Sequence, residues 1–171
     1  MKELNEGLKF KGLVVAVLEN KKTGKKRVFA TKNLVVTTGE VYYAQLGAEE
    51  ATTNAFGIME LGTAGTAPAA GQDRSAMTTK VTGSQKAFDA TYPKTNDGDA
   101  DNTGAGVGVV SYLTSYLTSE ANDTAISDVI ITNVTPGATE PILMHAKFGA
   151  TFNKTSSDTL KVFINHTPAG V

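Results

Sequence analysis

The sequence predicts a mainly β protein, either an antiparallel β-sandwich or a jelly-roll-like barrel, with one short helix. Charged residues make up 19% of the 171 residues, below the roughly 25% of ordinary soluble domains, and small residues replace them. Short apolar runs are separated by polar or glycine-containing turns, a pattern typical of strands. A chain of this length forms one core. We therefore expect an amino-terminal arm over residues 1–9 and a single β-rich domain over 10–171.

A basic β-hairpin is predicted at the start of the domain. Two apolar runs, Phe10–Leu18 and Arg27–Val36, flank a polar turn in which Gly24 is placed to take a positive φ. The first 40 residues contain nine basic and four acidic side chains, in a chain whose net charge is −1. Lysines at a strand edge deter unwanted pairing, and a basic end also suits an acidic neighbour. The cations expected to contact a partner are Lys21, Lys22, Lys25, Lys26 and Arg27.

The next elements are a helix, a strand and a long loop. Thr37 and Glu40 have the spacing of a capping box, which predicts a short helix that ends at Gly47. Phe56–Leu61 is a predicted strand, because it is apolar and a glycine-rich turn follows it. The loop after this turn is expected to contain one turn of helix within 74–81.

The second half of the chain is expected to be mostly strands. Lys86–Tyr92 is a candidate strand, and 93–106 is a polar, glycine-rich loop. Val107–Thr118 contains Ser-Tyr-Leu-Thr twice in tandem, and its threonine, tyrosine and valine content favours a strand over a helix. Ile126–Val134 is the next predicted strand.

A hairpin closes the chain, and its two strands alternate between apolar and polar residues. We expect one face of each strand to point into the core. These inward residues are Met144, Ala146, Phe148, Ala150 and Phe152 on the first strand, and Leu160, Val162 and Ile164 on the second.

The sequence contains little that suggests a metal site or a disulfide. Cysteine is absent, which excludes disulfides, thiolate zinc sites and cysteine nucleophiles. Asp97, Asp99 and Asp101 have the spacing of a calcium-binding loop, but Asn102 and Gly108 stand where such a loop needs glycine and glutamate. We expect a solvated acidic loop here, and we predict no metal and no cofactor.

No set of residues predicts catalysis either. His145 and His166 are the only histidines, and each is expected at a rim or an interface. The glycine-rich segments 62–65 and 104–108 lack the features of phosphate-binding or dinucleotide-binding loops, so they are predicted to be turns. A Gly-x-Ser-x-Gly nucleophile motif is also missing. The sequence therefore predicts a protein that is not an enzyme.

The composition also limits the classes of partner. A net charge of −1 argues against broad binding to nucleic acids or anionic membranes, because such binding needs a surplus of cations. The apolar run Leu13–Leu18 is far shorter than the roughly 20 residues of a membrane-spanning helix. The acidic residues near Met1 are unlike a signal peptide. We expect a protein made in a cytoplasm, without a membrane or specific nucleic-acid partner.

Three segments, in this order, resemble known sequences. They are Lys32-Asn-Leu-Val-Val-Thr-Thr-Gly39, Ile58-Met-Glu-Leu-Gly-Thr-Ala-Gly-Thr-Ala-Pro-Ala69, and a closing hairpin that runs from Leu143 through Lys154-Thr-Ser-Ser-Asp-Thr-Leu-Lys-Val162. This order resembles the small virion structural proteins of tailed bacteriophages. The resemblance covers roughly residues 30–166, and each motif in it is a strand followed by a turn.

The resemblance implies a non-enzymatic subunit that packs many times on a symmetric particle. Our first hypothesis is a capsid decoration (cement) protein in the virion, with the major capsid protein or other virion subunits as partners. The chain is expected to form a homo-oligomer, with a trimer as one arrangement. One alternative is a neck, tail or baseplate protein or a fibre adaptor. An alternative of another class is a carbohydrate-binding β-sandwich.

Overall fold

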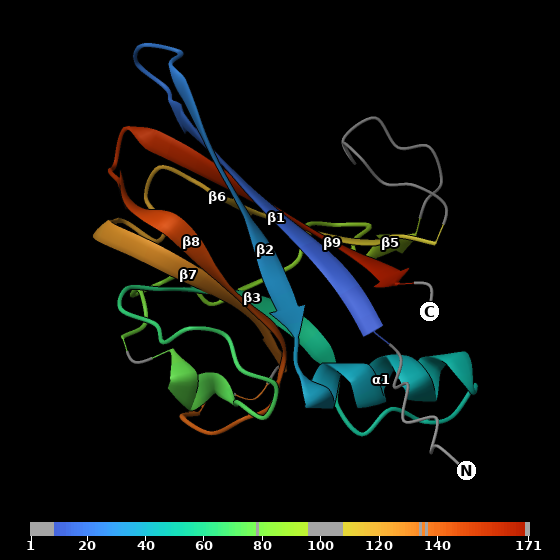
Figure 1. The fold of residues 1–171 in the computed structure, drawn as a ribbon. Coiled ribbons are helices and arrows are strands. Elements are labelled where there is room, and N and C mark those ends of the chain that lie inside the picture. The colour runs from blue at the N-terminus through green and yellow to red at the C-terminus, as the bar shows by residue number, and fades with distance from the viewer. Residues whose placement is uncertain (1–8, 78, 96–107, 134, 136, 170–171) are drawn as a thin grey trace.

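The computed structural model describes residues 9–77, 79–95, 108–133, 135 and 137–169, and it shows a mainly β, antiparallel fold with one short helix (Figure 1). The predicted fold class is thus confirmed. The helix is α1 (Thr37–Gly47), and η1 (Arg74–Ala76) is a single turn of 3-10 helix. The strands are β1 (Lys9–Asn20), β2 (Lys26–Val35), β3 (Phe56–Gly62), β4 (Lys86–Ala87), β5 (Lys94–Thr95), β6 (Val110–Tyr116), β7 (Asp123–Asn133), β8 (Ile142–Lys154) and β9 (Asp158–Ala169).

The strands form one sheet that curls into a half-barrel. Their order is β4-β3-β7-β8-β2-β1-β9-β6-β5, and every neighbouring pair is antiparallel. In Figure 1, β1 and β2 cross the front of the molecule, and β3 and β6 lie behind them. Of the two predicted arrangements, the curled sheet is closer to the barrel.

The segment that contains β4 and β5 bridges the two edges of the curled sheet. β4 pairs with β3, and β5 pairs with β6. Tyr116 on β6 donates its hydroxyl hydrogen to Ser84 O at 2.9 Å, and Lys86 Nζ donates to Ser115 O at 2.9 Å. Both terminal strands have only two residues, so each end of the sheet offers only a short edge for pairing. The predicted strand Lys86–Tyr92 is confined to Lys86–Ala87.

The core fills the concave side of the sheet. Alternate residues of β1 point inward: Val14 and Ala16 are completely buried, while the intervening Val15 is not. The inward residues predicted for the closing hairpin are buried with one exception, Ala150. The register of β7 with β8 shifts between the pairs 126/152 and 128/147, so the residues around 150 bulge out of the ladder. That bulge explains why Ala150 is exposed.

Helix α1 occupies the predicted residues, but its amino-terminal cap differs from the prediction. Val36, not Thr37, is the N-cap residue, and no side chain caps the helix. Val36 N donates to Leu143 O at 3.1 Å, so Val36 stays extended, and Thr37 N donates to Ala70 O at 2.9 Å. The neighbouring backbone takes the place of the predicted capping box. Buried Tyr43 joins the helix to the core.

Two sequence expectations lie largely outside the described residues. The predicted arm of residues 1–9 contributes only Lys9, which begins β1. The acidic loop with Asp97, Asp99 and Asp101 falls within 96–107, also outside the described part of the chain.

Candidate functional site

The predicted basic hairpin end is the turn that joins β1 and β2, together with the first residues of β2. Gly24 has a φ of 69°, as predicted. Asn20 Oδ1 accepts hydrogen bonds from the backbone of Lys22 at 3.1 Å and of Thr23 at 3.0 Å, which orders the turn. Lys21 N also donates to Ser157 O at 2.8 Å, so the β8–β9 turn supports the hairpin. Figure 1 shows that the hairpin extends beyond that neighbouring turn.

All five predicted contact residues are exposed at this end of the sheet: Lys21, Lys22, Lys25, Lys26 and Arg27. Lys21 Nζ lies 3.0 Å from Glu19 Oε1, and Arg27 Nη2 donates to Asn153 O at 3.0 Å. No carboxylate of the described residues forms an ion pair with the other four cations. The pKa of Glu19 is lowered first by Lys21, and also by Lys26 and Lys161. The hairpin end therefore presents a concentrated positive charge.

His145 is completely buried, so the prediction of a rim or interface residue is wrong. Its Nε2 lies 3.2 Å from Asp128 Oδ2, and its Nδ1 lies 2.5 Å from Gln72 Nε2. Gln72 belongs to the 63–77 segment, which lies over the outer face of β7 and β8. This segment buries a side chain that strand alternation alone would leave in solvent.

Ser127, Asp128 and His145 do not form a catalytic triad. In a triad the histidine bridges the serine and the carboxylate. Here the carboxylate is in the middle: Ser127 Oγ donates to Asp128 Oδ1 at 2.6 Å, and Gly65 N donates to the same oxygen at 3.3 Å. A Cβ on Gly65 would lie 1.9 Å from Asp128 Oδ2, so the turn needs glycine to approach the carboxylate. The cluster attaches the 63–77 segment to the sheet.

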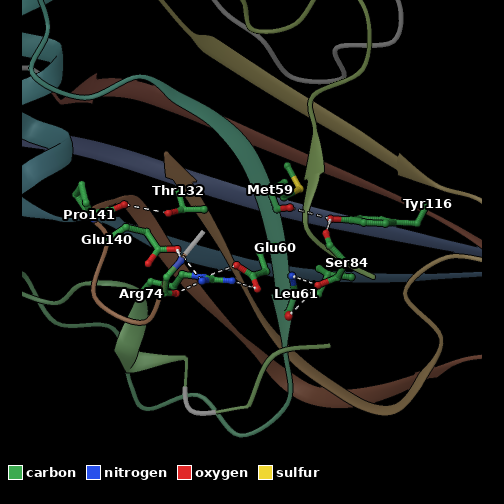
Figure 2. Close-up of polar contacts among 10 residues, drawn as sticks. Met59, Glu60, Leu61, Arg74, Ser84, Tyr116, Thr132, Glu140 and Pro141 are labelled. Carbon is green, nitrogen blue, oxygen red and sulfur yellow. Dashed lines mark hydrogen bonds and ion pairs between the residues drawn. The ribbon is translucent and has the colours of Figure 1, made fainter. Parts of the chain in front are cut away.

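A second polar cluster beneath the 63–77 segment joins Arg74, in η1, to two glutamates. Arg74 Nε and Nη2 each lie 2.6 Å from a Glu60 carboxylate oxygen, and Nη1 lies 2.6 Å from Glu140 Oε1. Arg74 Nη1 also donates to Gly137 O. Figure 2 shows Arg74 between the two glutamates, with Glu60 and Met59 on opposite sides of β3. The three charged side chains are buried. This ion network fixes η1 and the turn before β8.

His166 is also completely buried, which contradicts the prediction for that residue as well. It points into the core, where Nδ1 lies 2.6 Å from the Tyr43 hydroxyl oxygen. The Tyr43 and Tyr112 hydroxyl oxygens are 2.7 Å apart. Burial lowers the pKa of His166 to about 3, so the ring is neutral at ordinary pH. This arrangement ties α1 to β6 and β9.

Sequence reasoning missed the two polar clusters beneath the 63–77 segment. One signal was present: Glu60 interrupts an otherwise apolar predicted strand, and a buried carboxylate needs a cationic partner. Nothing in the sequence indicated that this partner is Arg74, because the pairing depends on how the loop folds back over β3.

Comparison with protein-family models, with curated proteins and with solved structures finds no match. Within the described ranges, no three histidine, aspartate or glutamate side chains gather as metal ligands. The same part of the chain has no helix that is long and apolar enough to cross a membrane.

Proposed function

We propose that this protein is a structural subunit of a tailed-bacteriophage virion that binds the outside of the head shell as a decoration (cement) protein. The observation that carries the proposal is the hairpin end. It projects from the sheet and presents five exposed cations on a supported turn. Such an end suits an acidic surface, because complementary charge speeds encounter and fixes the register of docking.

The resemblance of three ordered segments to phage virion proteins supports the same proposal. The structure adds a physical reason for one of these motifs. The turn Gly62–Gly65 packs against Asp128 and Met77, and a side chain at either glycine would collide with them. The motif thus holds the 63–77 segment on the sheet, and a rigid scaffold of this kind suits a subunit that is repeated many times.

The carbohydrate-binding alternative has less support. Sugar rings commonly stack on exposed aromatic side chains, and Trp is absent from the sequence. Tyr43, Tyr112 and Tyr116 are buried in the core, where no sugar could stack on them. Binding to a glycan array would favour this alternative.

Quantitative mass spectrometry of purified virions, from the phage whose genome encodes the chain, tests the proposal. For a decoration protein on a symmetric shell, we expect a molar ratio to the major shell protein of about one, or a simple fraction such as about one third. A ratio of a few percent, on the order of one ring of subunits per particle, would favour the neck, tail or baseplate alternative. Absence from the virion would contradict the proposal.

The charge of the hairpin end can be tested separately. Changing Lys21, Lys22, Lys25, Lys26 and Arg27 together to Gln should weaken binding to particles that lack the chain, and weaken it more at low salt than at physiological salt. The matched control changes the four lysines to Arg, which keeps the charge and should keep the binding. Unchanged binding of the Gln variant at both salt concentrations would show that the positive charge of the hairpin end does not contribute to binding.

A further inference from the structure

The convex side of the sheet is covered at its two flanks and bare between them. The 63–77 segment covers the flank formed by β3, β7 and β8, where it contacts Glu60, Asp128 and His145. On the opposite flank, Leu113 of β6 lies beside the outward residue Phe163 in the strand register, yet it is only 4% exposed. Between the flanks, the outward side chains of β2, β1 and β9 have no described segment packed over them, and β1 and β2 cross the front of the molecule in Figure 1.

The centre of this bare face is apolar. The strand register sets Val17 directly opposite Val28, and Val15 directly opposite both Ala30 and Phe163. Side chains opposed in this way on one face of a sheet touch their neighbours. Val28 is 62% exposed and Leu13 is 45% exposed. The apolar centre consists of Leu13, Val15, Val17, Val28, Ala30 and Phe163.

Lysines surround the apolar centre. Exposed side chains of this type lie on all three strands of the bare face: Lys11, Lys26, Lys32 and Lys161. The carboxylate on the same face is that of Glu19, which is paired with Lys21. Near Lys11 and Lys32 the surface is hollowed, with a volume of about 470 Å³ that Leu13 and Asn165 also line. The face therefore combines an apolar centre, a cationic rim and a depression large enough for a side chain.

We propose that the bare face of β2, β1 and β9 docks onto a different protein that carries an apolar patch bordered by aspartate and glutamate. This inference rests on the proposed docking function and specifies the chemistry of the partner. Protein interfaces commonly have an apolar core and a polar rim, and the lysine rim requires a rim of opposite charge on the partner. Two copies joined through this same face would place lysine against lysine, which disfavours a second copy as the occupant. Lys26 makes the bare face continuous with the hairpin end.

Two substitutions at Val28 separate the apolar and the ionic parts of the proposal. Val28→Glu and Val28→Lys both remove an exposed apolar side chain, but only the glutamate would face the partner's acidic rim. We expect Val28→Glu to weaken binding to particles that lack the chain on the order of tenfold, and Val28→Lys to weaken it clearly less. The matched controls are Val41→Glu and Val41→Lys on α1, where Val41 is 47% exposed. They should bind like the wild type, and thermal unfolding should show that all four variants are folded.

The outcomes distinguish this inference from the proposed function. If the wild type binds the particles and Val28→Glu binds equally well, the bare face is not the docking surface, although the proposed function stands. Equal losses of binding for the glutamate and lysine variants would contradict the proposal that the partner has an acidic rim. If the wild type itself does not bind, the proposed function fails. Sedimentation of the purified chain gives the remaining outcome: self-association that Val28→Glu abolishes would show that a second copy covers the face and would overturn the inference.

Discussion

Asn33 and His166 are in direct contact although a whole strand separates them. Asn33 lies on β2 and His166 on β9, and β1 runs between these strands. The Asn33 side-chain nitrogen is 2.6 Å from His166 Nε2 because both residues pair with the same residue of β1, Gly12. A Cβ on Gly12 would lie 1.2 Å from Asn33 Oδ1. Because Gly12 has no side chain, the Asn33 side chain can reach across β1 from β2 to His166 on β9.

The first prediction concerns Gly12. Gly12→Ala should displace Asn33, break its contact with His166 and lower the free energy of unfolding by about 1–3 kcal/mol, as overpacking in a core does. Urea denaturation measures the loss. Gly149→Ala is the matched control, since a Cβ there meets no atom within 4 Å. Adding Asn33→Ala to Gly12→Ala should recover part of the loss. Equal stabilities for the variants at Gly12 and Gly149 would contradict this account.

The second prediction concerns pH. The folded protein keeps His166 neutral down to a pH of about 3, whereas the unfolded chain takes up the proton near 6.5. The unfolded state therefore binds more protons between these values, and stability falls as the pH falls through this window. Between pH 6 and 4.5 the contribution of His166 should approach about 1.4 kcal/mol per pH unit.

Replacing the histidine separates this contribution from that of other groups. His166→Gln should unfold at a lower denaturant concentration at neutral pH, yet lose less stability than the wild type on acidification to pH 4.5. Denaturation curves at several pH values give both slopes. The explanation would be wrong if the two proteins lost stability in parallel.

The third prediction concerns the buried ion network. Arg74→Met leaves the carboxylates of Glu60 and Glu140 buried without their cation, which should cost about 3–5 kcal/mol of unfolding free energy. Lys21→Met breaks the exposed Lys21–Glu19 pair, which solvent screens, and should leave the free energy of unfolding nearly unchanged. Chemical denaturation compares the two. Replacing Arg74 and both glutamates with apolar residues should restore much of the stability, and similar effects of the two single variants would refute the buried network.

The fourth prediction concerns the attachment of the 63–77 segment. Asp128→Ala removes the acceptor of hydrogen bonds from Ser127, Gly65 and His145, and should destabilise the protein by about 1–3 kcal/mol. Hydrogen exchange measured by mass spectrometry should show faster exchange in peptides from 63–77 and unchanged exchange in β1 and β2. Asp128→Asn keeps one acceptor oxygen and should have a smaller effect. Uniformly faster exchange across the whole chain would show that Asp128 does not act locally.

At the candidate site, local sequence patterns are enough to predict the hairpin and the exposure of its cations. The β1–β2 hairpin, the positive φ of Gly24 and the exposure of the five basic residues all follow from a short stretch of chain. Part of the bare face follows from the same stretch of sequence. The sequence neighbours of the inward residues Val14 and Ala16 must point to the other face of the sheet. What covers an outward residue does not follow from alternation, and the prediction for His145 is wrong for this reason.

The sequence by itself determined that the protein is mainly β, where most strands and the α-helix lie, and which side of the two closing strands faces the core. These properties depend on side-chain alternation and turn residues within one segment. The tertiary structure alone decided the strand order, the bulge that exposes Ala150, the buried pairing of Arg74 with two glutamates and the covering of only part of the convex face. Those features arise from contacts between segments far apart in the chain, and the free energy of such contacts depends on geometry that no single segment contains.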